Sequence, residues 1–336
     1  MLVLGIESTC DETACALVKD GKEIIANFVS SQIDLHNEFG GVVPELACRR
    51  HVEVIIPLLE EMFASVNLSI QDVDLIAASY GPGLIGALLI GLNCAKTLSL
   101  ALNKPFVGVN HVEAHLYAAM MAHQDEIQFP CLGAVLSGGH TALVTIHEIG
   151  KYELIGQTVD DAIGEAFDKT AKILGLPYPG GPAIEKLAKE GDFSKYPFKC
   201  GVVKNQPLDF SFSGIKTGVL YAVKGQNTKE EKALSSQDKA DIAASFQHVA
   251  LNDIVQKIQK ACDLKGFDTV IFGGGVTNNN YLKELILKKC PTLKTIWPTG
   301  QLSLDNAAMI AGLGYHVYQK NGADSLSLQA QTSIPF

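Results

Sequence analysis

The sequence contains no Cys-x-x-Cys pair, although eight of its 336 residues are cysteines. Most of them lie inside apolar runs, where a free thiol behaves as a small core residue. The eight are Cys10, Cys15, Cys48, Cys94, Cys131, Cys200, Cys262 and Cys290. Scattered thiols of this kind indicate a reduced protein, so we expect a cytoplasmic location.

An excess of positive charge is also missing. Lys and Arg total 27 against 36 Asp and Glu, which gives a net charge of −9. A protein that binds nucleic acid unaided normally presents a basic face. The composition therefore argues against a free-standing nucleic-acid binder, while a local basic groove, or RNA held jointly with a partner, remains compatible with it.

No apolar run is both long and uninterrupted. The longest, 84–102, contains glycines, polar residues and Lys96, and it predicts a buried helix rather than a membrane span. The chain opens directly with a strand-like run at 1–8, without a basic leader. We therefore expect no membrane association.

The pentapeptide HVEAH places two histidines four residues apart. On a helix, His111 and His115 lie on one face a turn apart, so that both imidazoles could reach one ion. Glu113 follows His111 by two positions, about 200° around the helix, so the base of an HExxH protease is missing. Two interpretations stay open: a metal-binding pair, or two histidines satisfied by hydrogen bonds at a domain seam.

Two parts of the chain repeat one order of elements. LGIESTCDETACALV (4–18) and LGAVLSGGHTALV (132–144) both predict a strand, a turn and a second strand. The strand, glycine turn and helix predicted over 268–289 repeat those predicted from residue 74. Two echoes in the same order predict a duplicated α/β fold, with chance likeness of short strands as the alternative.

Other segments complete the prediction. Periodicity predicts a helix over 51–69, strands at 74–83 and 105–110, and a hairpin turn at KDGK (19–22). The polar stretch 224–240 predicts a loop and the start of a helix, to which we assign no chemistry.

Three glycine-rich turns, at 137–140, 178–182 and 273–279, offer backbone N–H groups to a phosphate. None ends in the GK[ST] of a phosphate loop, and each alone is more often a simple tight turn. Their gathering in one half of a duplicated chain favours a nucleotide site.

Two aspartates, Asp168 and Asp305, have two interpretations each, and a segment that begins with an aspartate has one. Asp168 either accepts a ribose or substrate hydroxyl or complements the start of a helix. The segment 209–214 (DFSFSG) alternates polar and apolar residues as an edge strand does. Asp305 either caps the helix that follows it or serves as the carboxylate of a 2-His-1-carboxylate metal site.

Taken in order, the motifs resemble one family. GIESTCDET, HVEAH, SGGHT, AFDKTAKILGLPYPGGP, DFSFSG and GGGVTNNN followed by LDNAAM are similar to those of the tRNA N6-adenosine threonylcarbamoyltransferases, in their bacterial form. The family was formerly described as O-sialoglycoprotein endopeptidase. The resemblance covers essentially the whole chain.

The resemblance implies an α/β fold of the actin, hexokinase and heat-shock ATPase superfamily, with two ribonuclease-H-like halves around a cleft. The N-terminal actin-like domain would comprise 1–128 and about 305–336. The C-terminal domain would comprise 129–304, with an inserted helical and loop segment at about 160–245.

It also implies the site residues. His111, His115 and Asp305 would bind one divalent metal ion, Fe²⁺ or Zn²⁺. The substrate-binding positions would be Val135, Leu136, Ser137, Gly138, Gly139, Asp168, Gly181, Glu185 and Asn279. Many members have aspartate where this chain has Glu185, which leaves that residue's contact with the substrate ribose open.

The implied reaction transfers a threonylcarbamoyl group from threonylcarbamoyl-adenylate to adenosine 37 of tRNAs reading codons that begin with A, and releases AMP. Asp11 is our candidate for orienting or deprotonating the amine, with a purely structural turn residue as the alternative. The implied partners are tRNA, an inactive paralogue and a small ATPase. A metalloprotease and a non-catalytic nucleotide-binding paralogue are the alternative functions.

Overall fold

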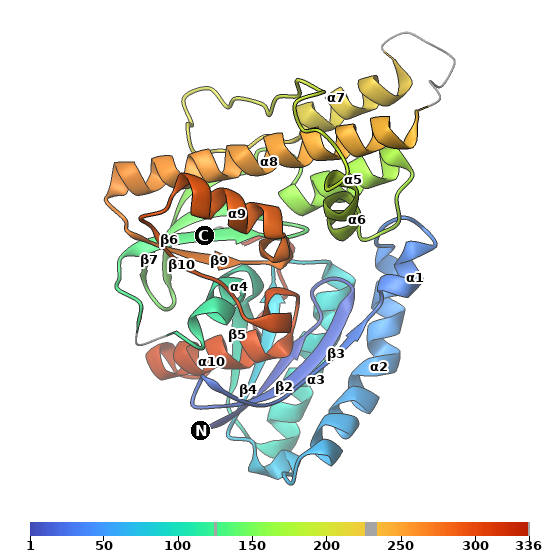
Figure 1. The fold of residues 1–336 in the computed structure, drawn as a ribbon. Helices are drawn as coiled ribbons and strands as arrows, with labels where there is room; N and C mark the ends of the chain where they lie inside the picture. Colours follow the sequence, from blue (N-terminus) through green and yellow to red (C-terminus); the bar gives the residue numbers. More distant parts are fainter. Residues whose placement is uncertain (124–125, 226–233, 335–336) are drawn as a thin grey trace. The chain divides into compact units, whose positions relative to one another are not determined.

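The computed structural model describes residues 1–123, 126–225 and 234–334. They divide into two compact units, whose helices and strands are labelled in Figure 1 where there is room. The first unit comprises Met1–Phe129, His147–Tyr152 and Ile296–Phe336, and the second comprises Pro130–Ile146 and Glu153–Thr295.

The first unit is built on a mixed sheet. Its described strands are β1 (Leu2–Glu7), β2 (Glu12–Lys19), β3 (Glu23–Ser31), β4 (Leu75–Gly81) and β5 (Phe106–Asn110). They lie in the order β3-β2-β1-β4-β5, with β1 antiparallel to β2 and parallel to β4. The predicted KDGK hairpin is confirmed: Asp20 and Gly21 both have positive φ, which suits the twist of the two strands it joins.

Helices cover this sheet. They are α1 (Ile33–Asn37), α2 (Pro44–Ser65), α3 (Ile85–Leu102), α4 (His111–Met120) and α10 (Ala307–Asn321), with the short 3-10 turns η1 (Ile70–Asp72) and η4 (Gly300–Ser303). The helix predicted from residue 51 begins earlier, at Pro44, because proline is well suited to the first position of a helix.

By length and composition alone, α3 could cross a membrane, and it is the one helix of the described residues that meets this test. A helix that covers a sheet meets the same test. Leu88, Leu92 and Ala95 form its buried face, and α3 packs against β4 and α2. The predicted helix over 84–102 is thus confirmed, with one face in the core.

The helix α10 lies unusually close to β1. A Cβ atom added at Gly5 would lie 2.3 Å from the backbone oxygen of Ala307 and 2.8 Å from the nitrogen of Ala311. Only glycine leaves room for this approach, which brings the start of α10 against the centre of the sheet.

The second unit repeats the first. Its described strands are β6 (Cys131–Leu136), β7 (Thr141–Glu148), β8 (Lys151–Gln157), β9 (Thr269–Gly273) and β10 (Lys294–Ile296). Their order, β10-β9-β6-β7-β8, is that of the first sheet, with β6 antiparallel to β7 and parallel to β9. Both echoes in the sequence therefore reflect a real duplication, and the predicted α/β fold is confirmed.

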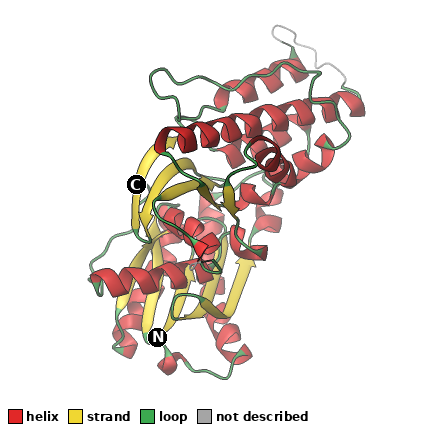
Figure 2. Cartoon of the chain, turned by 60° about the vertical axis from the view of Figure 1, so that its left-hand side comes forward, coloured by secondary structure: helices red, strands yellow, loops and turns green. Residues whose placement is uncertain are grey.

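The helices of the second unit are α5 (Ile163–Leu174), α6 (Gly180–Ala188), α7 (Ser213–Lys224), α8 (Ser236–Lys265) and α9 (Asn280–Lys289), with the 3-10 turn η3 (Gly275–Asn278). Figure 2 shows helices flanking the strands of each sheet. The helix start predicted within 224–240 is confirmed by α8, whereas residues 226–233 of that stretch lie outside the described residues.

The edge strand predicted at 209–214 is wrong. Phe210 makes a single bridge with Thr158, and α7 already begins at Ser213. The carboxylate of Asp160 accepts hydrogen bonds from the hydroxyls of Ser211 and Ser213, so the polar positions of this segment hold a loop.

Candidate metal centre and glycine turns

Both histidines of HVEAH lie on α4, as the spacing predicts. Asn110 caps this helix, and its side chain accepts hydrogen bonds from the backbone nitrogens of Val112 and Glu113. The rings of His111 and His115 lie 4.6 Å apart, edge to face, and both side chains are buried. The helix therefore presents two imidazoles toward one point.

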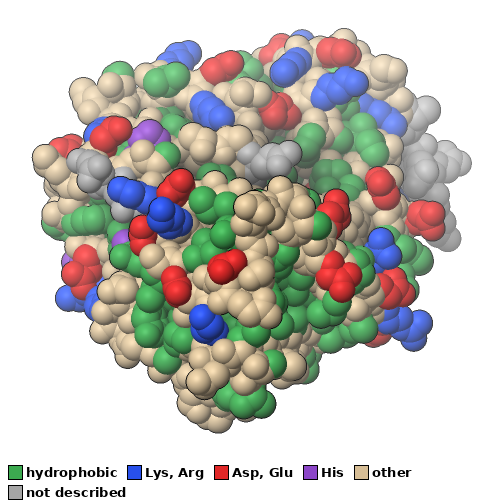
Figure 3. All heavy atoms as spheres, turned by 90° about the horizontal axis from the view of Figure 1, so that it is seen from below, with side chains coloured by type: hydrophobic (Ala, Val, Ile, Leu, Met, Phe, Trp, Pro, Cys, Tyr) green, Lys and Arg blue, Asp and Glu red, His purple; other side chains and the backbone are tan. Residues whose placement is uncertain are grey.

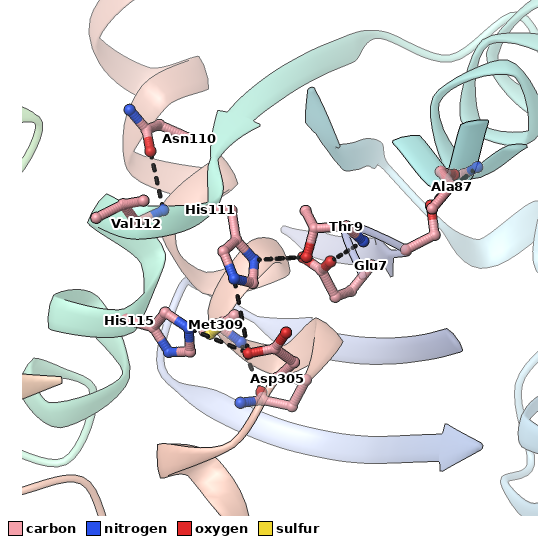
Figure 4. A network of polar contacts seen from close by, with 12 residues as sticks. Glu7, Thr9, Ala87, Asn110, His111, Val112, His115, Asp305 and Met309 are labelled. Atoms are coloured by element: carbon pink, nitrogen blue, oxygen red, sulfur yellow. Dashed lines mark hydrogen bonds and ion pairs between the residues drawn. The ribbon is translucent and has the colours of Figure 1, made fainter. Parts of the chain in front are cut away.

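Asp305 completes this group (Figure 4). Its Oδ1 atom lies 3.1 Å from Nε2 of His115 and 3.6 Å from Nε2 of His111. Asp305 precedes α10, whose N-cap is Asn306, with a side chain that accepts a hydrogen bond from the nitrogen of Met309. The interpretation of Asp305 as the cap is thus wrong, and its carboxylate faces the histidines instead.

Glu7, at the end of β1, supports His111 from the other side. Its Oε2 atom lies 3.0 Å from Nδ1 of His111, and its Oε1 accepts a 2.6 Å hydrogen bond from the nitrogen of Thr9. Burial alone would lower the pKa of His111, but the carboxylates of Glu7 and Asp305 outweigh it and raise the pKa to about 9. The site therefore favours positive charge.

More carboxylates lie nearby. Burial, then the charges of Asp305 and Asp11, raise the pKa of Glu12 well above its usual range. Asp11 itself lies buried in the turn after β1, and its backbone oxygen accepts a hydrogen bond from the nitrogen of Gln32. The candidate base thus belongs to the same unit and the same charged region as the two histidines.

The residues fit a metal ion. Neither ring nitrogen of His115 has an aligned hydrogen-bond partner among the described residues, although both atoms are buried. Unpaired buried imidazole nitrogens are costly unless something else satisfies them. The ligand atoms of His111, His115 and Asp305 lie within 4.8 Å of one another. Two nitrogens and a carboxylate, with Glu7 holding the far nitrogen of one imidazole, are donors that Fe²⁺ and Zn²⁺ accept.

The second unit holds the predicted substrate-binding positions. Val135 and Leu136 are buried in β6, so only their backbone can face a ligand. The chain then turns tightly, with the nitrogen of Ser137 donating to the oxygen of His140. Gly138 and Gly139 are exposed, and a Cβ atom at either would meet nothing within 4 Å. Packing within the protein therefore does not require glycine at these two positions.

Asp168 lies within α5 rather than before it, and its side chain binds the backbone at the start of the next helix, α6. Its Oδ1 atom accepts a 2.7 Å hydrogen bond from the nitrogen of Gly180, at the start of α6. Gly181 follows, and here too an added Cβ would meet nothing within 4 Å. Asp168 thus complements the start of a helix, as one of its two interpretations predicted, but that helix is α6 and not the helix that contains it.

Glu185 and Asn279 are both engaged by α9. Oε1 of Glu185 accepts hydrogen bonds of 3.0 Å from the backbone and side-chain nitrogens of Asn280. The side chain of Asn279 caps α9 through the nitrogen of Leu282 and donates to Gln247. These contacts tie α6, α8 and α9 together.

Gly274 lies in the third glycine turn, between β9 and η3. A Cβ atom there would lie 2.5 Å from the backbone oxygen of Leu136, and its φ is +94°. The nitrogen of Gly164, at the start of α5, donates to the oxygen of Ser137. The turn after β6 therefore contacts α5 on one side and the turn after β9 on the other. All the predicted substrate-binding positions belong to the second unit, and the predicted metal ligands belong to the first.

Three further residues belong to these sites without having been predicted: Glu7, Thr9, whose hydroxyl lies 3.3 Å from Nδ1 of His111, and Asn280. For Glu7 a signal exists, because an acidic residue ends an otherwise apolar buried strand. Asn280 gives no comparable signal.

Solved structures place this architecture in a known class. The chain is similar to full-length HypF in the phosphate- and nucleotide-bound form, with a TM-score of 0.61, 14% identity and coverage of 96% of this chain and 47% of that one. It is also similar to component A of (R)-2-hydroxyglutaryl-CoA dehydratase from Acidaminococcus fermentans, with a TM-score of 0.53, 13% identity and coverage of 95% and 98%. The fold is that of the actin-like α/β proteins.

Sequence comparison is more specific. Residues 23–312 match the family model described as tRNA N6-adenosine threonylcarbamoyltransferase. Relatives of that name include one from Protochlamydia amoebophila (strain UWE25), 64% identical with coverage of 100% of this chain and 98% of the relative. Another, from Chlamydia pneumoniae, is 49% identical with coverage of 96% and 93%. The chain belongs to the tRNA N6-adenosine threonylcarbamoyltransferase family, so the predicted family and transferase class are confirmed.

Proposed function

We propose that this chain transfers the threonylcarbamoyl group of threonylcarbamoyl-adenylate to the N6 amine of adenosine 37, in tRNAs reading codons that begin with A. The observation that carries the proposal is the 64% identity to a full-length relative of this name. The grouping of His111, His115 and Asp305 supports it, since a non-catalytic paralogue has no need of such a set.

In this reaction the adenosine nitrogen forms a bond to the carbamoyl carbon. The bond between that carbon and the phosphate oxygen breaks, and its electron pair leaves with AMP. Asp11 accepts the proton that the amine loses.

His111, His115 and Asp305 would hold the metal ion, Fe²⁺ or Zn²⁺, with Glu7 orienting His111. Such an ion, when bound, supplies a Lewis acid that polarises an oxygen of the donor.

The glycine turns would hold the adenylate. Gly138, Gly139 and Gly181 leave open space in which a phosphate can approach the backbone. Among the described residues, the nitrogens of Gly138 and Gly139 have no acceptor, so both can donate to a ligand. Asp168 and Glu185 orient α6 and α9 around these turns, and Asn279 fixes the start of α9.

We also propose that the protein works in the cytoplasm with an inactive paralogue and a small ATPase. The net charge of −9 is consistent with tRNA bound with the help of partners.

Incubation with threonylcarbamoyl-adenylate and an unmodified tRNA transcript, followed by nucleoside mass spectrometry, tests the proposal. The expected product is threonylcarbamoyladenosine at position 37, with AMP released in equal amount. A transcript with guanosine at that position is the matched control. Absence of the product, with the partner proteins present as well as without them, would refute the proposal.

A further inference from the structure

A second charged feature of the second unit is formed by residues other than those of the glycine turns. The carboxyl-terminal ends of α5 and α7 and the beginning of α8 surround a hollow of about 750 Å³ (helices labelled in Figure 1). Five lysines line it, namely Lys169, Lys172, Lys216, Lys224 and Lys239. No acidic side chain is among its described lining residues.

Part of this charge is balanced locally. Asp161 lies 2.6 Å from Nζ of Lys169 and 2.5 Å from Nζ of Lys216, and Glu165 lies 2.7 Å from Lys169. Within the described chain, Lys172 and Lys239 have no ion-pair partner. At least two ammonium groups of the hollow are therefore available to a ligand.

Stabilisation of a helix end does not by itself explain why both unpaired lysines, Lys172 and Lys239, lie here. Lys172 occupies the last turn of α5, where it complements the negative end of the helix. The ammonium of Lys239 lies at the same helix end, 3.9 Å from the position of a Cβ on Gly175. A helix end carries only about half an elementary charge, so it offsets about a quarter of these two positive charges. Lys239 also lies near the amino-terminal start of its own helix α8, where the macrodipole disfavours a cation.

The rest of the molecule makes this hollow unusual. Acidic residues outnumber basic ones, 36 to 27, which repels a polyanion on the whole. On the face drawn in Figure 3, acidic and basic side chains are interspersed, without an extended basic area among the coloured atoms. A polyanion would therefore bind where lysines outnumber the carboxylates that pair with them, as the five lysines of the hollow outnumber Asp161 and Glu165.

We propose that this lysine hollow binds the sugar–phosphate backbone of the tRNA substrate. The inference rests on the proposed function, which requires an RNA ligand. The hollow is also well placed, because Lys172 lies one helical turn from Asp168, which contacts the α6 glycine turn. Backbone contacts of this kind position an RNA without reading its sequence.

The test uses the full chain and a labelled, unmodified tRNA transcript in filter binding between about 0.05 and 0.2 M salt. The double variant Lys172→Gln/Lys239→Gln should bind about 30-fold more weakly at about 0.15 M salt, with a salt slope smaller by about two. The matched control, Lys260→Gln/Lys288→Gln, removes two exposed lysines of the same unit outside the hollow and should stay within about twofold of wild type. Both variants should melt as the wild type does.

Three binding outcomes would overturn the inference: no tRNA binding by the wild-type chain at low salt, unchanged affinity and slope in the hollow variant, or an equal loss in the control. Titration with inorganic tripolyphosphate distinguishes two possible ligands of the hollow, the phosphates of tRNA and a free polyphosphate. If tripolyphosphate binding is lost in the hollow variant while tRNA binding is kept, the hollow is a small-anion site and the inference is wrong. Nucleoside analysis of the wild type reports on the proposed function separately, since tRNA binding through the hollow does not depend on product formation.

Discussion

The Oε2 atom of Glu7 lies 3.0 Å from Nδ1 of His111, so a carboxylate from the first strand fixes an imidazole that comes 104 residues later. Glu7→Gln keeps the shape of this side chain but removes its charge. We expect metal affinity to fall about 10- to 100-fold, as for other outer carboxylates that hold a metal-binding histidine. Competition with a chromophoric chelator measures this, and unchanged affinity would show that Glu7 does not support the site.

The histidines themselves should be indispensable to metal binding. His111→Ala or His115→Ala removes one of three ligands, and we expect stoichiometric metal and tRNA modification to be lost together. Metal content of the purified variants, by elemental analysis, is the measurement. Either variant retaining one ion per chain would contradict the assignment. Circular dichroism is the control for folding, because both side chains are buried.

Asp305 and Asn306 are neighbours with separate roles, and this allows a matched pair of variants. Since Asn306 is the cap, Asp305→Asn should change the free energy of unfolding by no more than roughly 0.5 kcal/mol and abolish metal binding. Asn306→Ala should lose about 1 kcal/mol of stability and keep the metal. Thermal melts and metal analysis of both proteins distinguish the two roles. Full turnover by Asp305→Asn would leave the histidines without their third ligand.

The glycine turns predict a contrast between two valine substitutions. At Gly274, with φ +94° and ψ 159°, a side chain is strained by about 1–3 kcal/mol and also meets Leu136, so Gly274→Val should destabilise the fold. A Cβ atom added at Gly138 meets nothing within 4 Å, so Gly138→Val should melt as the wild type does. Its binding of the adenylate should nevertheless be weaker, because the side chain takes the space that the phosphate needs. Calorimetric titration with AMP and thermal melts test this. Normal AMP binding by Gly138→Val would place the phosphate elsewhere.

Local signals in the sequence were enough for much of the fold. The duplicated sheets follow from two strand–turn–strand echoes, and α4 follows from the spacing of His111 and His115. The edge strand predicted at 209–214 is wrong because polar and apolar residues alternate there for another reason. The hydroxyls of Ser211 and Ser213 both donate to the carboxylate of Asp160. Alternation of polar and apolar residues therefore does not by itself identify a strand.

The site was less predictable, because its members meet through folding. The four-residue spacing of His111 and His115 predicts that they lie side by side on a helix. The sequence does not show whether Asp305 or Asn306 caps α10, because that depends on which side chain turns toward the helix backbone. The link between Glu7 and His111 joins β1 to α4 across 104 residues of sequence and leaves no periodic trace. The lysine hollow was missed for the same reason, since its charges come from three helices.

The discontinuous first unit has a consequence for biosynthesis. Chains are made from the amino terminus, and His111 and His115 emerge well before Asp305, with the second unit synthesised in the interval. A nascent or truncated chain ending before Asp305 holds two of the three proposed ligands and lacks the helix that packs against Gly5. Metal loading is therefore expected to follow release from the ribosome, and any fragment ending before residue 305 should emerge metal-free however well its first 129 residues fold.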